Sequence, residues 1–244
     1  EAAYQISKFG INVDLYEMRP KVKTEAHQTK YLAELVCSNS FRSDDKEYNA
    51  VGVLHEELRI ADSLIMKCAD HNKVPAGSAL AVDRDNFSKD VNKTIKSIPN
   101  INIINQEVRS LDEFKNQRVI VSTGPLTSKT LTESIKIKTS ENSLAFYDAI
   151  APIVYEETIN MSVAWKQSRY DKGNGDDYIN CPLSKEEYYQ FIEKIKKAPK
   201  MEFKEFEDTP FFEGCMPIEE IIRRGDETLR SVSYTHLTLP TNHP

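Results

Sequence analysis

The segment EAAYQISKFGINVDLYE (1–17) is the strongest indication of the fold. Residues 1–9 predict a helix, and Gly10 stands where a helix C-cap would. Ile11, Val13 and Leu15 then alternate in a short strand that ends at Glu17. Helix, glycine, strand and terminal acid form the second half of a dinucleotide-binding βαβ unit, in which the acid follows a glycine-rich turn by roughly 20 residues. That turn would fall at or before residue 1, so we expect it outside this sequence.

The segments that follow alternate between helical and strand patterns. Val51, Leu54, Leu58, Ala61, Ile65 and Cys68 recur at three- or four-residue steps, which predicts one helix over residues 49–70 with Cys68 as a packed core thiol. Residues 74–82 predict a small-residue loop, and residues 85–97 a helix. Strands are predicted at 101–108 and 118–124. This alternation is typical of an α/β fold with a mostly parallel sheet.

A second region begins after Gly124. Residues 144–154, 161–170 and 176–181 predict extended segments, and residues 185–197 a charged helix that Ser184 and Glu187 begin as a capping box. We therefore expect a partial dinucleotide-binding domain at 1–143, an inserted α+β domain at 144–230, and a tail at 231–244 that fits neither and is treated as an assembly artefact.

Composition restricts the class of protein. The 244 residues are 39% hydrophobic and 29% charged with a net charge of −6, and no apolar run has the length of a membrane span. An acidic chain gives no sign of nucleic-acid binding by itself. The cysteines form no CxxC pair and have no metal spacing to histidine, so we expect no metal, no disulfides and a cytoplasmic location. They are Cys37, Cys68, Cys181 and Cys215.

Several residues are candidates for cofactor binding. Glu17, at the end of its strand, could accept hydrogen bonds from the ribose hydroxyls of a dinucleotide, or could be an exposed strand-end acid. Arg19 could face the same nucleotide or solvent. Thr123 and Gly124 follow an apolar run in a turn that would let the backbone approach a cofactor, although an ordinary strand-to-loop turn gives the same pattern.

Two cysteines are candidates for catalysis. Cys215 lies in FFEGCMPIEEIIRRG (211–225), beside a predicted helix start at Pro217, where the helix dipole would favour the thiolate. A buried inert thiol is the alternative. Cys37 ends the apolar part of AELVCSNSFRS (33–43), and Asn39 and Ser40 follow in a turn that could hold a flavin, a phosphate or a pyrimidine, or could be a polar loop.

The order of motifs resembles one family, the TrmFO family of folate- and FAD-dependent tRNA uracil-5-methyltransferases. The resemblance covers residues 1 to about 230 and rests most on AELVCSNS and FEGCMPIE, within the series VDLYEMRP, AVGVLHEELR, VPAGSALAVDR, VSTGPLTS, FYDAIAPIV, SRYDKG and NCPLS. It implies a Rossmann-like, GidA-like FAD-binding domain with an inserted α+β domain. Against that pattern the glycine loop and the C-terminal part are missing, so we expect this chain to bind FAD poorly and to have little or no activity.

The resemblance also implies a reaction. The family makes 5-methyluridine at position 54 of the tRNA T-loop, with methylenetetrahydrofolate as carbon donor and FAD with NAD(P)H as reductant. Cys215 would add to uracil C6, and Cys37 would act as the base at C5 or hold the flavin-bound carbon. FAD would be lined by Glu17, Arg19, Asn39, Ser40, Thr123 and Gly124. RNA phosphates would contact the basic residues Lys166, Arg169, Lys172, Arg223 and Arg224.

Three alternatives stay open. Some family members modify ribosomal RNA, and a related flavin family modifies the tRNA wobble uridine. The motifs around Cys37 and Cys215 favour the C5-methylating group but do not separate tRNA from ribosomal RNA. A flavoprotein oxidoreductase without an RNA substrate is a second alternative. A non-catalytic RNA-binding fragment is the third, and the acidic net charge argues against it. No protein partner is inferred.

Overall fold

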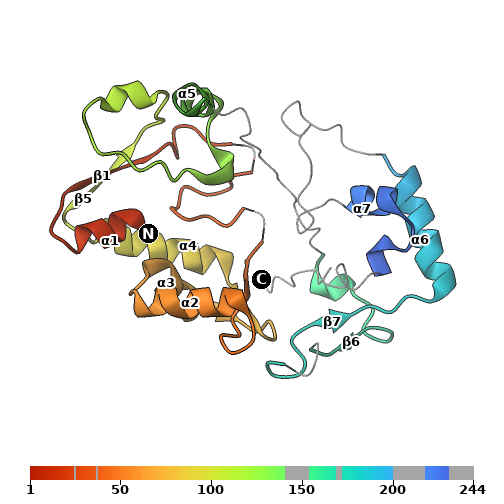
Figure 1. Ribbon diagram of the computed structural model, residues 1–244. Coiled ribbons are helices and arrows are strands. Elements are labelled where there is room, and N and C mark those ends of the chain that lie inside the picture. Colours follow the sequence, from red (N-terminus) through yellow and green to blue (C-terminus); the bar gives the residue numbers. More distant parts are fainter. Residues whose placement is uncertain (25, 37, 141–153, 169–171, 200–217, 231–244) are drawn as a thin grey trace. The chain divides into compact units, whose positions relative to one another are not determined.

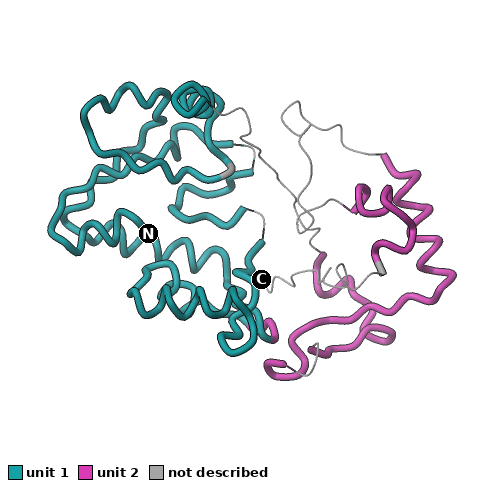
Figure 2. Tube along the Cα trace, viewed as in Figure 1, with its two compact units in different colours: residues 1–74, 78–146 teal, residues 75–77, 147–244 magenta. Residues whose placement is uncertain are grey.

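A computed structural model describes residues 1–24, 26–36, 38–140, 154–168, 172–199 and 218–230. The chain divides into two compact units, residues 1–74 with 78–146 and residues 75–77 with 147–244 (Figure 2). Cys37, Arg169, Cys215, Pro217, the segment 144–153 and the tail 231–244 lie outside the described residues.

Unit 1 contains a parallel pair of strands, where the sequence predicts nucleotide binding (Figure 1). Helix α1 (Ala2–Ser7) leads into β1 (Val13–Glu17), which pairs in parallel with β5 (Ile101–Asn105), so that Glu17 lies opposite Asn105. Gly10 has φ of +71° and its amide donates to the Ser7 carbonyl, which ends the helix as predicted. Helix α4 (Arg84–Lys96), capped by Asp83, precedes β5. The predicted α/β class is confirmed.

A small antiparallel sheet lies in the same unit. Its strands are β2 (Ser40–Ser43), β4 (Ala79–Val82) and β3 (Lys73–Val74), in the order β2-β4-β3. The prediction of a loop over residues 74–82 was therefore wrong for its second half. Leu80 and Val82 are fully buried. The segment is rich in small residues, which are typical of loops, and a strand of four residues is too short to show an alternating pattern.

The predicted helix over residues 49–70 is two helices, α2 (Ala50–Ile60) and α3 (Leu64–His71). Asp62 between them has φ of +60°, and the Ser63 side chain accepts from the amide of Met66 as the N-cap of α3. The buried face of α2 also differs from the predicted stripe, because Leu54 is exposed while Gly52 and His55 are buried. Cys68 is buried in the core as expected, and burial raises the pKa of its thiol to about 11.

The core of unit 1 forms where α3, α4 and the two sheets meet. Phe41 and Phe87 pack edge to face with ring centroids 5.5 Å apart. The helix predicted over residues 85–97 is confirmed as α4, which contributes Phe87, Val91 and Ile95 to this core. The most buried members of this core are Leu64, Met66, Ala69, Leu80, Val82, Phe87, Val91 and Ile95.

Replacing Gly52 by alanine is expected to destabilise unit 1 by about 2 kcal/mol. A Cβ at this position would lie 2.3 Å from the backbone carbonyl of Asp45, a contact that only a backbone shift relieves. This cost outweighs the gain of roughly 1 kcal/mol in helix propensity. Urea unfolding followed by circular dichroism measures the change, with Val53→Ala on the exposed side of the same helix as the control. Equal stability of the two variants would contradict the close approach.

The strand predicted at residues 118–124 was wrong. The segment pairs with no strand of the described chain, and Val119, Ile120 and Val121 are 45%, 62% and 43% exposed. An apolar run becomes a strand only where a neighbouring backbone offers a ladder of hydrogen bonds. Gly124 then begins a 3₁₀ turn (Gly124–Leu126), and helix α5 (Lys129–Thr139) follows.

Unit 2 combines a short hairpin with a helix pair. Strands β6 (Trp165–Lys166) and β7 (Ile179–Asn180) pair antiparallel, so among the described residues the segments predicted at 161–170 and 176–181 each contain two strand residues. Helix α6 (Lys185–Lys197) begins with the predicted capping box, and α7 (Ile218–Arg224) packs against it (Figure 1). No helix in the described part of the chain is long and apolar enough to cross a membrane.

Candidate functional site

The carboxylate at the end of β1 is held by the arginine that follows it. Arg19 Nε donates to Glu17 Oε1 at 3.0 Å, and Arg19 Nη2 donates to Oε2 at 3.0 Å. The Arg19 amide also donates to Oε1 at 2.9 Å. Asn105, opposite Glu17 on β5, donates from its side chain to the Arg19 carbonyl. The parallel register therefore fixes the backbone of Arg19 as well as that of Glu17.

Glu34 completes this cluster and was missed by sequence reasoning. Arg19 Nη1 donates to Glu34 Oε2 at 2.7 Å, on the side of the guanidinium away from Glu17. The other oxygen of Glu34 accepts from the amides of Gln28 and Thr29 at 2.8 and 3.0 Å. We call Glu17, Arg19 and Glu34 the clamp. Arg19 and Glu34 are 15 positions apart, and no local sequence pattern predicts that they form an ion pair.

The clamp is a buried ion network. The side chains of Arg19, Glu34 and Glu17 are 6%, 9% and 17% exposed. Burial by itself raises the pKa of Glu17, but the hydrogen bonds and charge of Arg19 outweigh it and hold that pKa below the ordinary value. Burial and the nearby Arg19 charge lower the pKa of His27. The His27 ring accepts at Nδ1 from the Thr24 amide, which fits the neutral form.

Acidification is expected to remove the stability that Glu17 contributes. Because the pKa of folded Glu17 lies below the ordinary 4.5, its contribution is complete above about pH 4.5 and is lost as the pH falls through the folded pKa. The pKa of His27 is also lowered, so its contribution to stability is lost at higher pH than that of Glu17, as the pH falls below the ordinary value of 6.5. Urea midpoints between pH 8 and pH 3 measure both. Glu17→Gln should flatten the lower window and exposed Glu133→Gln should not, and an unchanged profile in Glu17→Gln would refute the assignment.

Asn39 and Ser40 belong to the antiparallel sheet. Asn39 is 4% exposed; its side-chain Nδ2 donates to the Val82 carbonyl at 3.0 Å, and its own carbonyl accepts from the Val82 amide. Its Oδ1 atom is buried and has no hydrogen-bond partner. Ser40 begins β2 opposite Ala81, and its hydroxyl accepts from the Arg42 amide. A buried acceptor without a donor costs free energy, so Asn39 has capacity for a bound N–H or O–H group.

Thr123 and Gly124 form a turn of their own. Gly124 has φ of +69°, a conformation that favours glycine, and a Cβ there would meet nothing within 4 Å. The Thr127 hydroxyl donates to the Gly124 carbonyl at 2.7 Å, and because it has a single proton, the Thr123 hydroxyl donates to Thr127. The structure thus brings Glu17 and Arg19 into direct contact, while Asn39 with Ser40 and Thr123 with Gly124 occupy separate elements.

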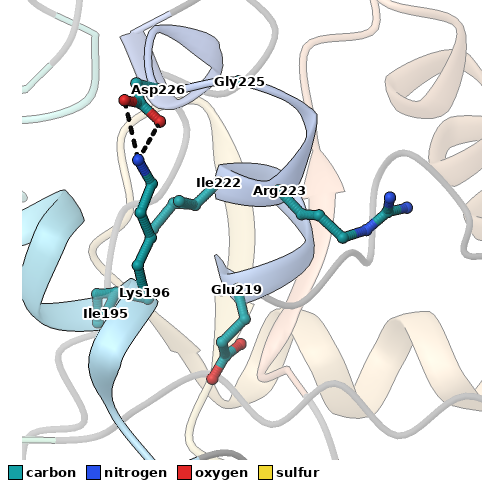
Figure 3. A pocket seen from close by; sticks show the side chains of 7 residues that line it. All are labelled: Ile195, Lys196, Glu219, Ile222, Arg223, Gly225 and Asp226. Carbon is teal, nitrogen blue, oxygen red and sulfur yellow. Dashed lines mark hydrogen bonds and ion pairs between the residues drawn. The ribbon is translucent and has the colours of Figure 1, made fainter.

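The two candidate catalytic cysteines lie outside the described residues. Three positions after Cys215, helix α7 begins, with Glu219 and Glu220 in its first turn. A pocket of about 350 Å³ lies between α6 and α7, where Lys196 is paired with Asp226 (Figure 3). Lys196 is also paired with Glu193 on its own helix. Of the other two thiols, Cys68 is buried and Cys181 is exposed. No group of three or more metal-binding side chains occurs among the described residues.

The parallel pair with its strand-end carboxylate defines a protein of the α/β class. The sequence profile of the family described as "Glucose inhibited division protein A" matches residues 1–243. The chain belongs to this GidA family.

Curated relatives carry one common name. A Bartonella henselae protein is 56% identical over 94% of this chain, one from Bradyrhizobium diazoefficiens is 58% identical over 94%, and one from Bartonella bacilliformis is 54% identical over 100%. Each is named methylenetetrahydrofolate–tRNA-(uracil-5-)-methyltransferase TrmFO. The chain spans about half the length of these relatives, 50% to 53%.

Proposed function

We propose that this chain is part of a folate- and FAD-dependent tRNA uracil-5-methyltransferase. The observation that carries the proposal is the identity of 54% to 58% to proteins of that name along nearly the whole chain. Within the protein, residues 1–143 form part of the FAD-binding domain, residues 144–230 the inserted domain, and the uridine of the tRNA T-loop is the target.

The described residues fit FAD. Glu17 Oε1 already accepts two N–H groups and Oε2 accepts one, so Oε2 keeps one acceptor position for a ribose hydroxyl. Asn39 Oδ1 offers the second acceptor, and Gly124 an open approach to backbone. Ser40 and Thr123 supply hydroxyl groups. When bound, FAD supplies the electrons that NAD(P)H delivers for reduction of the transferred carbon.

The thiols supply the polar chemistry. Uracil C5 becomes nucleophilic once a thiolate adds at C6, and we assign this addition to Cys215. After the one-carbon unit of methylenetetrahydrofolate has joined C5, a base must remove the C5 proton so that tetrahydrofolate can leave, and we assign this role to Cys37. Reduction of the methylene carbon that remains then restores the C5–C6 double bond and releases the Cys215 thiolate. The target base must leave its stacked position to reach two thiols.

Product formation tests the proposal. An extended protein is prepared in which this chain replaces the matching segment of the Bartonella henselae relative, and it is compared with the chain alone. Each is incubated with unmodified tRNA, methylenetetrahydrofolate, FAD and NADPH, and 5-methyluridine is measured by mass spectrometry. We expect product from the extended protein and little from the chain alone.

Parallel reactions separate the alternatives. Methylation of ribosomal RNA with no methylation of tRNA would show that ribosomal RNA is the substrate. If NADPH is oxidised at the same rate with and without RNA and folate, and no methylated product forms, the protein is a flavoprotein oxidoreductase without an RNA substrate. Salt-sensitive tRNA binding without any turnover would leave an RNA-binding protein. Each of these three results would overturn the tRNA methyltransferase assignment.

A further inference from the structure

We propose that Arg19 is a positioning residue, which acts on the cofactor only through Glu17 and requires Glu34 to do so. The proposal rests on the function proposed above, because it assumes that Glu17 receives the ribose of FAD. It replaces the sequence-based expectation that Arg19 itself lines the cofactor.

The exposed fractions of Arg19 and Glu17 indicate which of the two side chains a ligand can reach. Arg19 has 6% of its side chain exposed, whereas Glu17 has 17%. The guanidinium is enclosed between two carboxylates, and Nε, Nη1 and Nη2 each donate to one of them. A ligand that approaches the end of β1 would thus meet the carboxylate before it meets the arginine.

The hydrogen bonds fix which oxygen of Glu17 remains available. Arg19 binds both oxygens side by side, which sets the plane of the carboxylate. The Arg19 amide fills the second position on Oε1. One position on Oε2 is then the only acceptor that points away from the arginine, so the clamp selects a single orientation for a ribose hydroxyl.

Glu34 holds the guanidinium from its other edge. One oxygen binds Arg19 Nη1 and the second binds the amides of Gln28 and Thr29. Glu34 therefore anchors the guanidinium to the backbone of residues 28–29. Lysine could not replace Arg19, because one ammonium group cannot bind Glu17 by two parallel hydrogen bonds and reach Glu34 at the same time.

Amide hydrogen exchange in the chain alone tests the anchor. Glu34→Ala should speed exchange of the amides of residues 28 and 29 by about tenfold, the loss expected for a charge-assisted hydrogen bond. The exposed Glu133→Ala variant, whose partner is Lys136 on the surface of α5, is the matched control. Unchanged exchange at both amides would overturn the anchor.

A double-mutant cycle in the extended protein tests the route from Arg19 to the cofactor. FAD dissociation constants are measured by flavin fluorescence for the parent, Arg19→Lys, Glu17→Gln and the double variant, each checked by circular dichroism for folding. We expect Arg19→Lys to weaken FAD binding about tenfold in the parent and less than about twofold in the Glu17→Gln background. Exposed Arg109→Lys is the control for charge and length.

The outcomes distinguish the two proposals. Equal weakening by Arg19→Lys in both backgrounds would mean that Arg19 contacts FAD directly, and would overturn the inference alone. FAD binding that Arg19→Lys leaves unchanged would also overturn it alone. Failure of the parent to bind FAD would overturn the proposed function, and with it the positioning role.

Discussion

Replacing Cys215 by alanine in the extended protein is expected to abolish 5-methyluridine formation, with a rate loss on the order of 10⁴-fold or more. Without a thiolate to add at C6, uracil C5 does not become a nucleophile, and no other group in the proposed mechanism does this work. The rate is measured by mass spectrometry of tRNA under single-turnover conditions, with FAD content checked by absorbance so that cofactor loss is not mistaken for a chemical defect.

Cysteine controls make this result specific. Exposed Cys181→Ala should leave the rate unchanged, since this thiol has no assigned role. Cys68→Ala should lower stability, because Cys68 is packed in the core, while leaving the rate of folded protein intact. Cys37→Ala should also block product, at proton removal after Cys215 has added to the RNA. Normal turnover by Cys215→Ala would require another nucleophile and a different mechanism.

Replacing Arg19 by methionine is expected to cost about 3–5 kcal/mol of the stability of unit 1. The substitution keeps most of the side-chain volume but leaves two buried carboxylates, Glu17 and Glu34, without their shared cation. An uncompensated buried charge costs more than the pair itself contributes, and part of the loss should be recovered at acidic pH, where protonation removes the charge of Glu17.

Hydrogen exchange at core amides such as those of Val82 and Phe87 reports the stability of unit 1 alone, which matters because a chain of two units need not unfold in one step. Arg109→Met, at an arginine whose side chain is 72% exposed, is the matched control and should change stability by less than about 0.5 kcal/mol. Equal effects of the two substitutions would show that the clamp adds nothing to stability.

Much of the candidate site could be anticipated from residue order, but its connections could not. The strand end at Glu17 follows from alternation and from Gly10, and the structure places the carboxylate there. Asn39 was expected at the site because it lies in a polar turn. The hydrogen bond from its side-chain amide to the carbonyl of Val82, 43 residues away, and the unpartnered Oδ1 are seen only in the folded chain. Arg19 was expected beside a nucleotide, and only the folded chain brings Glu34 to its other edge.

Local sequence patterns were enough to predict the end of α1 at Gly10, the capping box of α6, the helix α4 and the burial of the Cys68 thiol. Each depends on residues within a turn or two of one another. Only the folded chain showed the antiparallel strand β4, the run at residues 119–121 that pairs with no described strand, and the clamp. These depend on which distant backbone or charge is available as a partner, and hydrogen bonds and ion pairs across 15 or more positions leave no periodic trace in the sequence.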